Sequence, residues 1–296
     1  MMQKFSGAWP ALITPFTADN EVDIRAIDAL IDYLLDKQVG GFYLCGSTGQ
    51  GIYQSVAERK LTAETALSRI DGRVPAIVHV GSQSLPDAIE LALHAQRAGA
   101  SGVSSIIPAG YTDLASVSRY YTAVAGAVPS LPFLPYLFTS ASSAVALIQS
   151  ISDIPNLAGA KYTGPNMYEL REVIEARGEP WSIFSGMDEQ CVFGAMLGTC
   201  GNIGSTLNVM PGIYREIHKF VAAGDAMSAR DLQLRTNRVT KTLFAFDFMA
   251  ALYEAVSMLG VGAGGPRLPS LPFDKKRRNE LRAALDAVDF LEIAAM

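Results

Sequence analysis

Short apolar runs alternate along this chain with longer amphipathic segments. Glycine or proline bounds most of the runs, as expected of buried strands in a parallel sheet. The sequence therefore predicts strands separated by helices. The runs cover residues 8–14, 41–46, 74–80, 102–107, 131–136, 157–162, 181–186 and 200–205.

The segments between these runs have helical periodicity. In residues 23–37, isoleucine and leucine recur at helical spacing, and Gly40 follows as a stop signal. Residues 85–98 repeat the pattern before Gly99. An open doubly wound sheet usually has fewer strands and a phosphate-binding fingerprint after the first one. The alternation therefore predicts an α/β fold, a (β/α)8 TIM barrel, as the catalytic domain over residues 1–224.

The strand signal disappears after residue 224. Helical segments at 224–244 and 246–260 are followed by a Gly/Pro-rich break at 261–273 and a charged amphipathic stretch at 275–293. These segments predict a C-terminal helical extension over residues 225–296, without the strands expected of a separate domain.

The composition is typical of a compact protein and argues against some classes of partner. Of the 296 residues, 49% are hydrophobic and 18% charged, and the formal net charge is −5. The one basic run, at 275–278, lies in an amphipathic stretch with acidic residues after it, so nucleic acid is not expected as a partner. The first residues lack a signal-peptide pattern, and no apolar run reaches about 18 residues. We therefore expect a cytoplasmic protein without a membrane partner.

No cofactor pattern is visible in the sequence. The cysteines (Cys45, Cys191, Cys200) lack CxxC spacing, and the histidines (His79, His94, His218) form no paired-ligand motif. A phosphate-binding glycine loop is also missing. We expect buried cysteines that act as small hydrophobes, and chemistry that needs neither a metal nor a diffusible cofactor.

Lys161 is the first candidate for that chemistry, because active sites of (β/α)8 barrels lie at the carboxyl ends of the strands. It follows the small apolar run 157–160 at the end of the sixth predicted strand. Desolvation there would favour the neutral amine that attacks a ketone. The alternative is a lysine whose amine reaches out to solvent.

Tyr136 and the run Gly46-Ser47-Thr48-Gly49 end the fifth and second predicted strands. A phenol at a strand end can relay protons, although tyrosines also cap barrel cores. The hydroxyls of Ser47 and Thr48, with neighbouring amides, could hold a carboxylate, or the run could be an ordinary turn.

Strands seven and eight end in polar residues too. Asp188 and Glu189 could accept hydrogen bonds from a polyol. An aspartate here could equally be a helix N-cap, with Glu189 exposed in the first helical turn. The eighth strand leads into Gly204-Ser205-Thr206.

Taken together, these motifs resemble the dihydrodipicolinate synthase and N-acetylneuraminate lyase family. The likeness spans nearly the whole chain and includes residues 11–16, 159–163 and 265–269. GSTG in the second motif, GMDE after strand seven and NIGSTLN after strand eight are similar to the N-acetylneuraminate lyase branch.

The resemblance implies a class I aldolase that cleaves a 2-keto-3-deoxy sugar acid, first of all N-acetylneuraminate, to pyruvate and N-acetylmannosamine. It implies Lys161 as the Schiff-base lysine, Tyr136 as proton relay, and Ser47 and Thr48 on the substrate carboxylate. It also implies a homotetramer. The residues it places along the sugar chain are Thr163, Gly186, Asp188, Glu189 and Ser205.

Some positions depart from the family pattern. Leu137-Phe138-Thr139 replaces the usual residues after the strand-five tyrosine, and Gln50 replaces a glutamate. Ala141 stands where dihydrodipicolinate synthases carry an arginine. Tyr111 is a further candidate for the proton relay. A 2-keto-3-deoxygluconate-type aldolase, a dihydrodipicolinate synthase and a non-catalytic sugar-acid or pyruvate sensor remain as alternatives.

Overall fold

Parallel strands form the centre of the computed structural model, which describes residues 5–138, 143–177 and 181–296. Neighbouring strands pair in the order β1-β8-β7-β6-β5-β4-β3-β2. Each overlaps one of the apolar runs, so the predicted strands are confirmed, although some extend one or two residues beyond the run. Their bounds are β1 (Gly7–Pro10), β2 (Phe42–Leu44), β3 (Ala76–His79), β4 (Gly102–Ile106), β5 (Phe133–Phe138), β6 (Gly159–Thr163), β7 (Ser182–Ser185) and β8 (Gly201–Gly204).

The sheet closes into a barrel between its first two strands. A parallel bridge joins Ala11 to Tyr43, and the Leu12 amide donates to the Tyr43 carbonyl at 2.9 Å. Side chains fill the interior, as expected of a barrel of this size. The interior cluster consists of Phe5, Trp9, Ala11, Tyr43, Ile77, Leu134, Ala158, Phe184 and Ile203.

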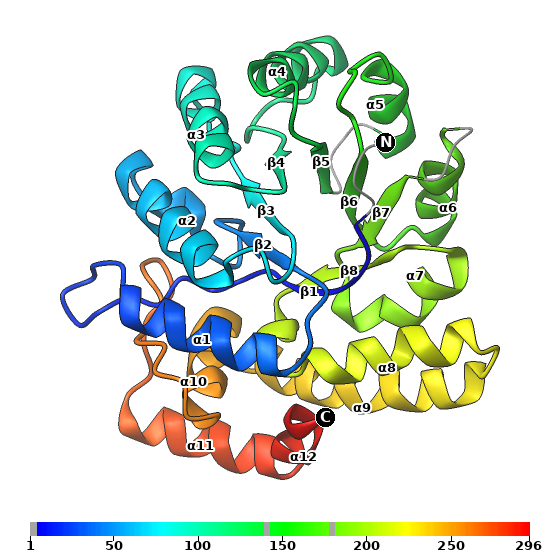
Figure 1. The fold of residues 1–296 in the computed structure, drawn as a ribbon. Helices are drawn as coiled ribbons and strands as arrows, with labels where there is room; N and C mark the ends of the chain where they lie inside the picture. The colour runs from blue at the N-terminus through cyan, green and yellow to red at the C-terminus, as the bar shows by residue number, and fades with distance from the viewer. Residues whose placement is uncertain (1–4, 139–142, 178–180) are drawn as a thin grey trace.

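Helices form the outer ring around the strands (Figure 1). Capping side chains mark many of their starts: Ser55 and Glu58 form a reciprocal capping box, and Ser84 caps a helix with proline in its first turn. The predicted (β/α)8 barrel is confirmed. The ring consists of α1 (Ile24–Asp36), α2 (Val56–Ile70), α3 (Leu85–Arg97), α4 (Leu114–Ala127), α5 (Ala144–Ser150), α6 (Met167–Glu175), α7 (Cys191–Leu197) and α8 (Pro211–Ala222).

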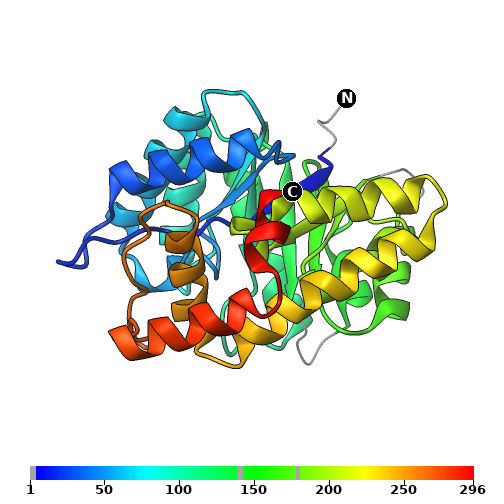
Figure 2. The same cartoon turned by 90° about the horizontal axis from the view of Figure 1, so that it is seen from below.

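Short 3-10 turns follow β2, β7 and β8: η1 (Gly51–Tyr53), η2 (Asp188–Gln190) and η3 (Thr206–Asn208). The tail consists of α9 (Ala226–Phe244), α10 (Phe248–Met258), α11 (Lys275–Asp286) and α12 (Phe290–Ala295). Figure 2 shows α9 alongside α8. Asp289, with φ 57°, separates α11 from α12, so the amphipathic stretch at 275–293 is two helices. The helical extension is confirmed, whereas the domain boundary at residue 224 stays a prediction.

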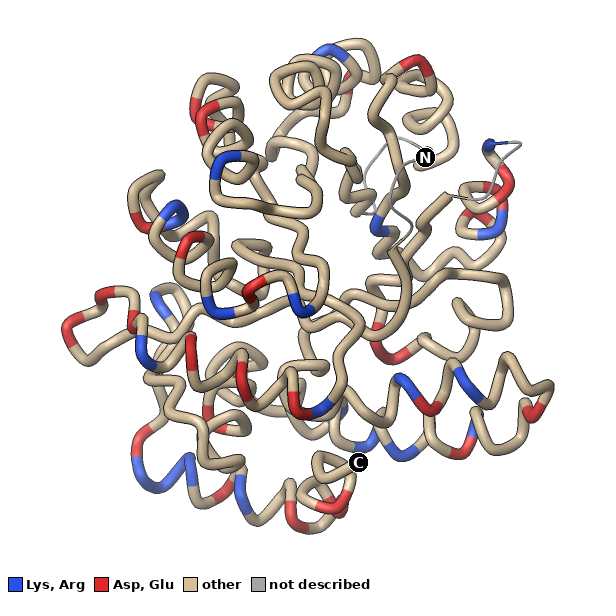
Figure 3. Tube along the Cα trace, in the orientation of Figure 1, with Lys and Arg blue, Asp and Glu red and all other residues tan. Residues whose placement is uncertain are grey.

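Charged residues of both signs are interspersed along the outer helices (Figure 3). This agrees with the absence of a long basic run in the sequence. Among the described residues, no helix is both long and apolar enough to cross a membrane.

Candidate active site

Lys161 lies buried at the barrel mouth between two aromatic rings. Its Nζ is 4.4 Å from the ring centroid of Tyr136 and 5.0 Å from that of Tyr43. Lys161 and Tyr136 are register partners on β6 and β5, so pairing of these strands brings the two predicted residues together. With 6% of its surface exposed, Lys161 does not reach out to solvent. An amine held over ring faces at a barrel mouth is placed to react with a bound carbonyl compound.

Sequence reasoning did not identify Tyr43. Its ring stands edge-to-face on Tyr136 with centroids 6.5 Å apart, and its hydroxyl is 2.9 Å from Ser104 Oγ. The ring also explains a glycine in the second motif, because a Cβ at Gly46 would lie 2.7 Å from a Tyr43 ring carbon. A tyrosine within the apolar run Phe42-Tyr43-Leu44 is indistinguishable from a core residue in the sequence.

The loop after β2 is held in an unusual backbone conformation. Cys45 and Gln50, on either side of Gly46–Gly49, have φ of 58° and 52°. Non-glycine residues adopt such angles at a cost that surrounding contacts must offset, and they often mark functional loops. Here Ser47 is exposed and Thr48 is buried. The Thr48 hydroxyl lies 2.7 Å from that of Ser205, so the second and eighth strand ends meet.

Gln50, one of the departures from the family pattern, ties this loop to the tail. Its Nε2 donates to the Arg267 carbonyl at 3.1 Å, and its Oε1 accepts from the Arg267 amide at 2.9 Å. A glutamate carboxylate could accept the second bond but could not donate the first. A structural role therefore explains why glutamine stands at this position: its amide links the loop of the GSTG motif to residues 265–269.

Thr163 and Gly186 lie next to each other beside the lysine. A Cβ at Gly186 would come within 1.8 Å of Thr163 Oγ1 and 2.8 Å of Lys161 Cε, so a larger residue there would displace both side chains. The buried Thr163 hydroxyl has no hydrogen-bond partner among the described residues. Such a group is available to a ligand or a water.

Asp188 is buried and binds the loop after β8. Its Oδ2 accepts from the Thr206 amide at 2.9 Å and the Thr206 hydroxyl at 2.8 Å, while Oδ1 faces Gly204 and has no partner among the described residues. Burial raises the pKa of Asp188 to about 6, although the bonds from Thr206 oppose the rise. Asp188 does not cap its own helical turn, whose N-cap is Met187, and Glu189 is half-buried rather than exposed.

The raised pKa of Asp188 predicts a pH-dependent stability. Because the folded protein holds this proton from about pH 6 downward and the unfolded chain only from about 3.8, the Asp188 contribution to stability falls as pH rises between those values. Asp188→Asn should remove this cost, so its stability relative to wild type should rise by about 2 to 3 kcal/mol between pH 4 and pH 7. Denaturant unfolding across that range measures it.

Asp225 is the matched control, because hydrogen bonds with Ser228 hold the pKa of this exposed N-cap below its usual value. Asp225→Asn should therefore show the opposite trend and lose stability relative to wild type as pH rises. If the difference between wild type and Asp188→Asn does not change with pH, the Asp188 carboxyl is not perturbed by its burial.

A histidine and an arginine lie beneath the mouth, and sequence reasoning assigned neither a role. Arg59 donates to the carbonyls of His79 and Gly81 at 2.6 and 2.9 Å. Burial, with the positive charges of Arg59 and Lys161, holds the pKa of His79 well below its usual range. The neutral His79 accepts from the Ile106 amide at 3.0 Å, so this pair supports the loops after β3 and β4.

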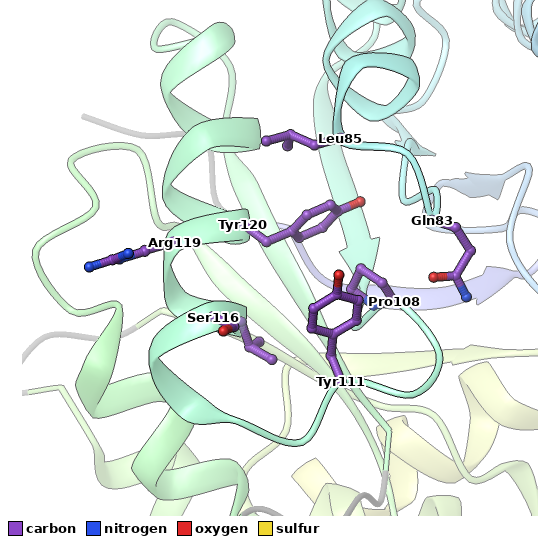
Figure 4. Close-up of a pocket in the computed structure, with 8 residues that line it drawn as sticks. Gln83, Leu85, Pro108, Tyr111, Ser116, Arg119 and Tyr120 are labelled. Carbon is purple, nitrogen blue, oxygen red and sulfur yellow. The ribbon is translucent and has the colours of Figure 1, made fainter.

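Tyr111 belongs to a different cleft. Figure 4 shows its ring beside Pro108 and Tyr120, and 52% of its surface is exposed. The cleft has a volume of about 310 Å³ and is also lined by Gln83 and Leu85. Among the described residues, no hydrogen bond or ring contact joins Tyr111 to Lys161 or Tyr136. Ala141, the position of the missing arginine, lies outside the described residues.

The remaining reactive groups are possible metal ligands and free thiols. In the described ranges no three His, Cys, Asp or Glu side chains cluster as a metal site would require. Cys45 and Cys191 are buried as expected, whereas Cys200 is only partly buried.

The comparisons with known proteins decide the family. A model of the dihydrodipicolinate synthetase family matches residues 4–288. The chain belongs to this family. It is therefore an enzyme of the pyruvate-dependent aldolase class, as the sequence resemblance implied.

Relatives within the dihydrodipicolinate synthetase family are named for two different activities, a lyase and a synthase. N-acetylneuraminate lyase of Rhizobium meliloti is 32% identical over 96% of this chain and 95% of the relative. 4-Hydroxy-tetrahydrodipicolinate synthase of Nitratidesulfovibrio vulgaris is 28% identical over 96% and 98%. Membership alone therefore leaves the second substrate open.

Solved structures of the family share the whole fold. N-acetylneuraminate lyase of Proteus mirabilis superposes with a TM-score of 0.93 at 30% identity, covering 97% of this chain and 100% of that one. A prophage protein of the dihydrodipicolinic acid synthase family from E. coli K12, in complex with pyruvate, gives 0.90 at 28% identity, covering 97% and 99%. The likeness thus extends over the barrel and the helical tail.

Proposed function

We propose that this protein is a Schiff-base lyase that reversibly cleaves N-acetylneuraminate, a 2-keto-3-deoxy sugar acid, to pyruvate and N-acetylmannosamine. The observation that carries the proposal is Lys161, buried at the barrel mouth over the ring faces of Tyr136 and Tyr43. No metal or diffusible cofactor is needed, because the protonated imine that Lys161 forms with the substrate is the electron sink.

The reaction follows from the chemistry of an amine and a 2-keto acid. The Lys161 nitrogen gives up a proton and attacks the keto carbon. The same proton then leaves with the former keto oxygen as water, which leaves a protonated imine. Cleavage of the C3–C4 bond sends its electron pair into the imine and gives a neutral enamine. Tyr136 takes the proton of the C4 hydroxyl as the aldehyde forms and returns one to C3 of the enamine. Hydrolysis of the resulting imine releases pyruvate and restores the amine.

The remaining strand ends are assigned to the two halves of the substrate. Ser47 and Thr48 would hold the carboxylate next to the keto group, in the loop that Gln50 fixes. The unpartnered hydroxyl of Thr163 supports its role on the sugar chain. Gly186, Asp188, Glu189 and Ser205 complete that side of the mouth.

The alternatives differ in the aldehyde half or in turnover. A 2-keto-3-deoxygluconate-type aldolase would use the same lysine on a six-carbon acid. A dihydrodipicolinate synthase is less well supported, since Ala141 cannot hold a second carboxylate. A non-catalytic sensor is an alternative because Gln50 and residues 137–139 depart from the family pattern. The hydrogen bonds of Gln50 with Arg267 explain the first departure by structure, so it no longer supports a sensor.

A substrate screen tests the proposed reaction. Purified protein is given N-acetylneuraminate, a six-carbon 2-keto-3-deoxy acid, or pyruvate with a series of aldehydes, and pyruvate released or consumed is measured. We expect cleavage of N-acetylneuraminate. Efficient cleavage of the six-carbon acid alone would replace the substrate but keep the aldolase. Imine formation without turnover on any acid would identify a sensor.

Glu189→Ala tests the assignment of the sugar side. If Glu189 accepts hydrogen bonds from the distal hydroxyls, its loss should penalise nine-carbon acids by about 1 to 3 kcal/mol and leave six-carbon acids nearly unaffected. Steady-state kinetics on both acids measure the difference. Glu175→Ala, at an exposed glutamate on α6, is the control. An equal penalty on both acids would mean that Glu189 acts on the fold rather than on the sugar.

We further propose that the protein is cytoplasmic and forms a homotetramer; the family resemblance implies the tetramer. Light scattering coupled to size-exclusion chromatography tests the assembly.

A further inference from the structure

Phe138 is an aromatic side chain at the mouth with no role in the scheme above. Tyr136 and Phe138 are two apart on β5, so both project to the barrel interior, whereas Leu137 points outward. The Phe138 ring stands edge-to-face on Tyr136 with centroids 6.0 Å apart. Yet 51% of Phe138 remains exposed. The ring is therefore held in place while part of its apolar surface faces the opening.

Packing of the fold does not account for this exposed ring. Leu137 is 3% exposed and belongs to the core between strands and helices. This strand end therefore already contributes a buried side chain to the core without Phe138. A single exposed apolar side chain on an outer helix would need no explanation. Phe138 differs because its register partner is Thr163, whose buried hydroxyl is unpartnered. Binding pockets commonly combine an apolar wall with a few such polar groups.

The order of residues around the mouth places this ring on the sugar side. Phe138 on β5 adjoins Thr163 on β6, which adjoins Gly186 at the end of β7, and Asp188 follows on η2. The ring therefore flanks the groups assigned to the distal hydroxyls. It follows the proton relay Tyr136 by two residues, on the same face of the strand. With the distal hydroxyls assigned to those groups, a substrate chain that extends from C4 toward them would run past the ring.

We infer that Phe138 determines substrate specificity by packing against the C–H surface and N-acyl methyl group of a long, uncharged aldehyde half. A short aldehyde half that carries a charge would lose hydration against the ring without gaining a partner. The inference rests on the proposed function and names the part of the substrate that the site selects. It also gives a role to one of the residues that depart from the family pattern.

Substrate comparison in Phe138 variants tests this inference. Covering the exposed half of the ring should favour the long acid, so Phe138→Ala should lower kcat/KM for N-acetylneuraminate by about three- to tenfold relative to that for a six-carbon 2-keto-3-deoxy acid. Phe138→Leu, which keeps apolar bulk, should fall between wild type and Phe138→Ala. In the condensation direction, Phe138→Ala should improve use of a short charged aldehyde relative to N-acetylmannosamine.

Controls separate this inference from the proposed function. Tyr168→Ala removes another exposed aromatic ring, on α6, and should change no ratio. Thermal unfolding checks that each variant is folded. Equal losses for both acids in Phe138→Ala would mean that the ring only supports Tyr136, and unchanged ratios would mean that it contacts no substrate; either result overturns the inference. If wild type forms no imine with pyruvate and cleaves neither acid, the proposed function itself fails.

Discussion

Lys161→Ala should abolish imine formation and lower turnover by at least about four orders of magnitude, the scale on which removal of a covalent nucleophile acts. In wild type, borohydride reduction in the presence of pyruvate should add one pyruvyl group to Lys161. The amine is the only described lysine nitrogen that lies over two ring faces at the barrel mouth. Mass spectrometry of proteolytic peptides locates the adduct, and an aldolase assay measures turnover.

Lys37 provides the matched control, because its amine also lies over an aromatic ring, 5.7 Å from the centroid of Tyr33. It follows the C-terminal end of α1 and therefore lies at the end of the barrel opposite the mouth. Lys37→Ala should keep both labelling and turnover. A pyruvyl adduct on another lysine, or labelling that survives in Lys161→Ala, would contradict the mechanism.

The sequence was sufficient for the fold because the strands of a parallel barrel are buried on both faces. Burial makes them continuous apolar runs, and glycines and prolines limit those runs. The strand ends could therefore be predicted, and with them the positions of Lys161, Tyr136 and Asp188 at the barrel mouth. What the sequence does not encode locally is which strand ends meet. The contact of Thr48 with Ser205 and that of Asp188 with Thr206 depend on closure of the barrel and on the β7–β8 pair.

Three other features could be recognised only in the folded structure. In the sequence, Tyr43 looks like an ordinary core residue of an apolar strand. Only the closure of the barrel between β1 and β2 places its ring beside the Lys161 amine. Gln50, directly after the GSTG motif, is a conspicuous substitution, but its partner Arg267 is 217 residues away. Phe138 illustrates the same limit, since alternation along β5 assigns its direction whereas its exposure depends on the neighbouring strand.

Tyr136→Phe should leave imine formation measurable but slow turnover by about two to four decades, the range expected for loss of a positioned proton relay. The phenyl ring preserves the aromatic face 4.4 Å from the Lys161 amine and the edge contact with Phe138. Only the hydroxyl that exchanges protons with the C4 oxygen and with C3 of the enamine is lost. Borohydride trapping with pyruvate measures the first step, and steady-state cleavage of N-acetylneuraminate measures the whole cycle.

Tyr162→Phe distinguishes chemistry from packing at nearly the same position in the sheet. Tyr162 follows Lys161 on β6 but points outward, and its hydroxyl donates to Glu169 at 2.9 Å. Its loss should lower stability by about 1 kcal/mol and leave the turnover number unchanged. If Tyr136→Phe also leaves the turnover number unchanged, Tyr136 is not the relay. A rise in KM alone would make it a binding residue, and the proton would then have to pass through another group at the mouth.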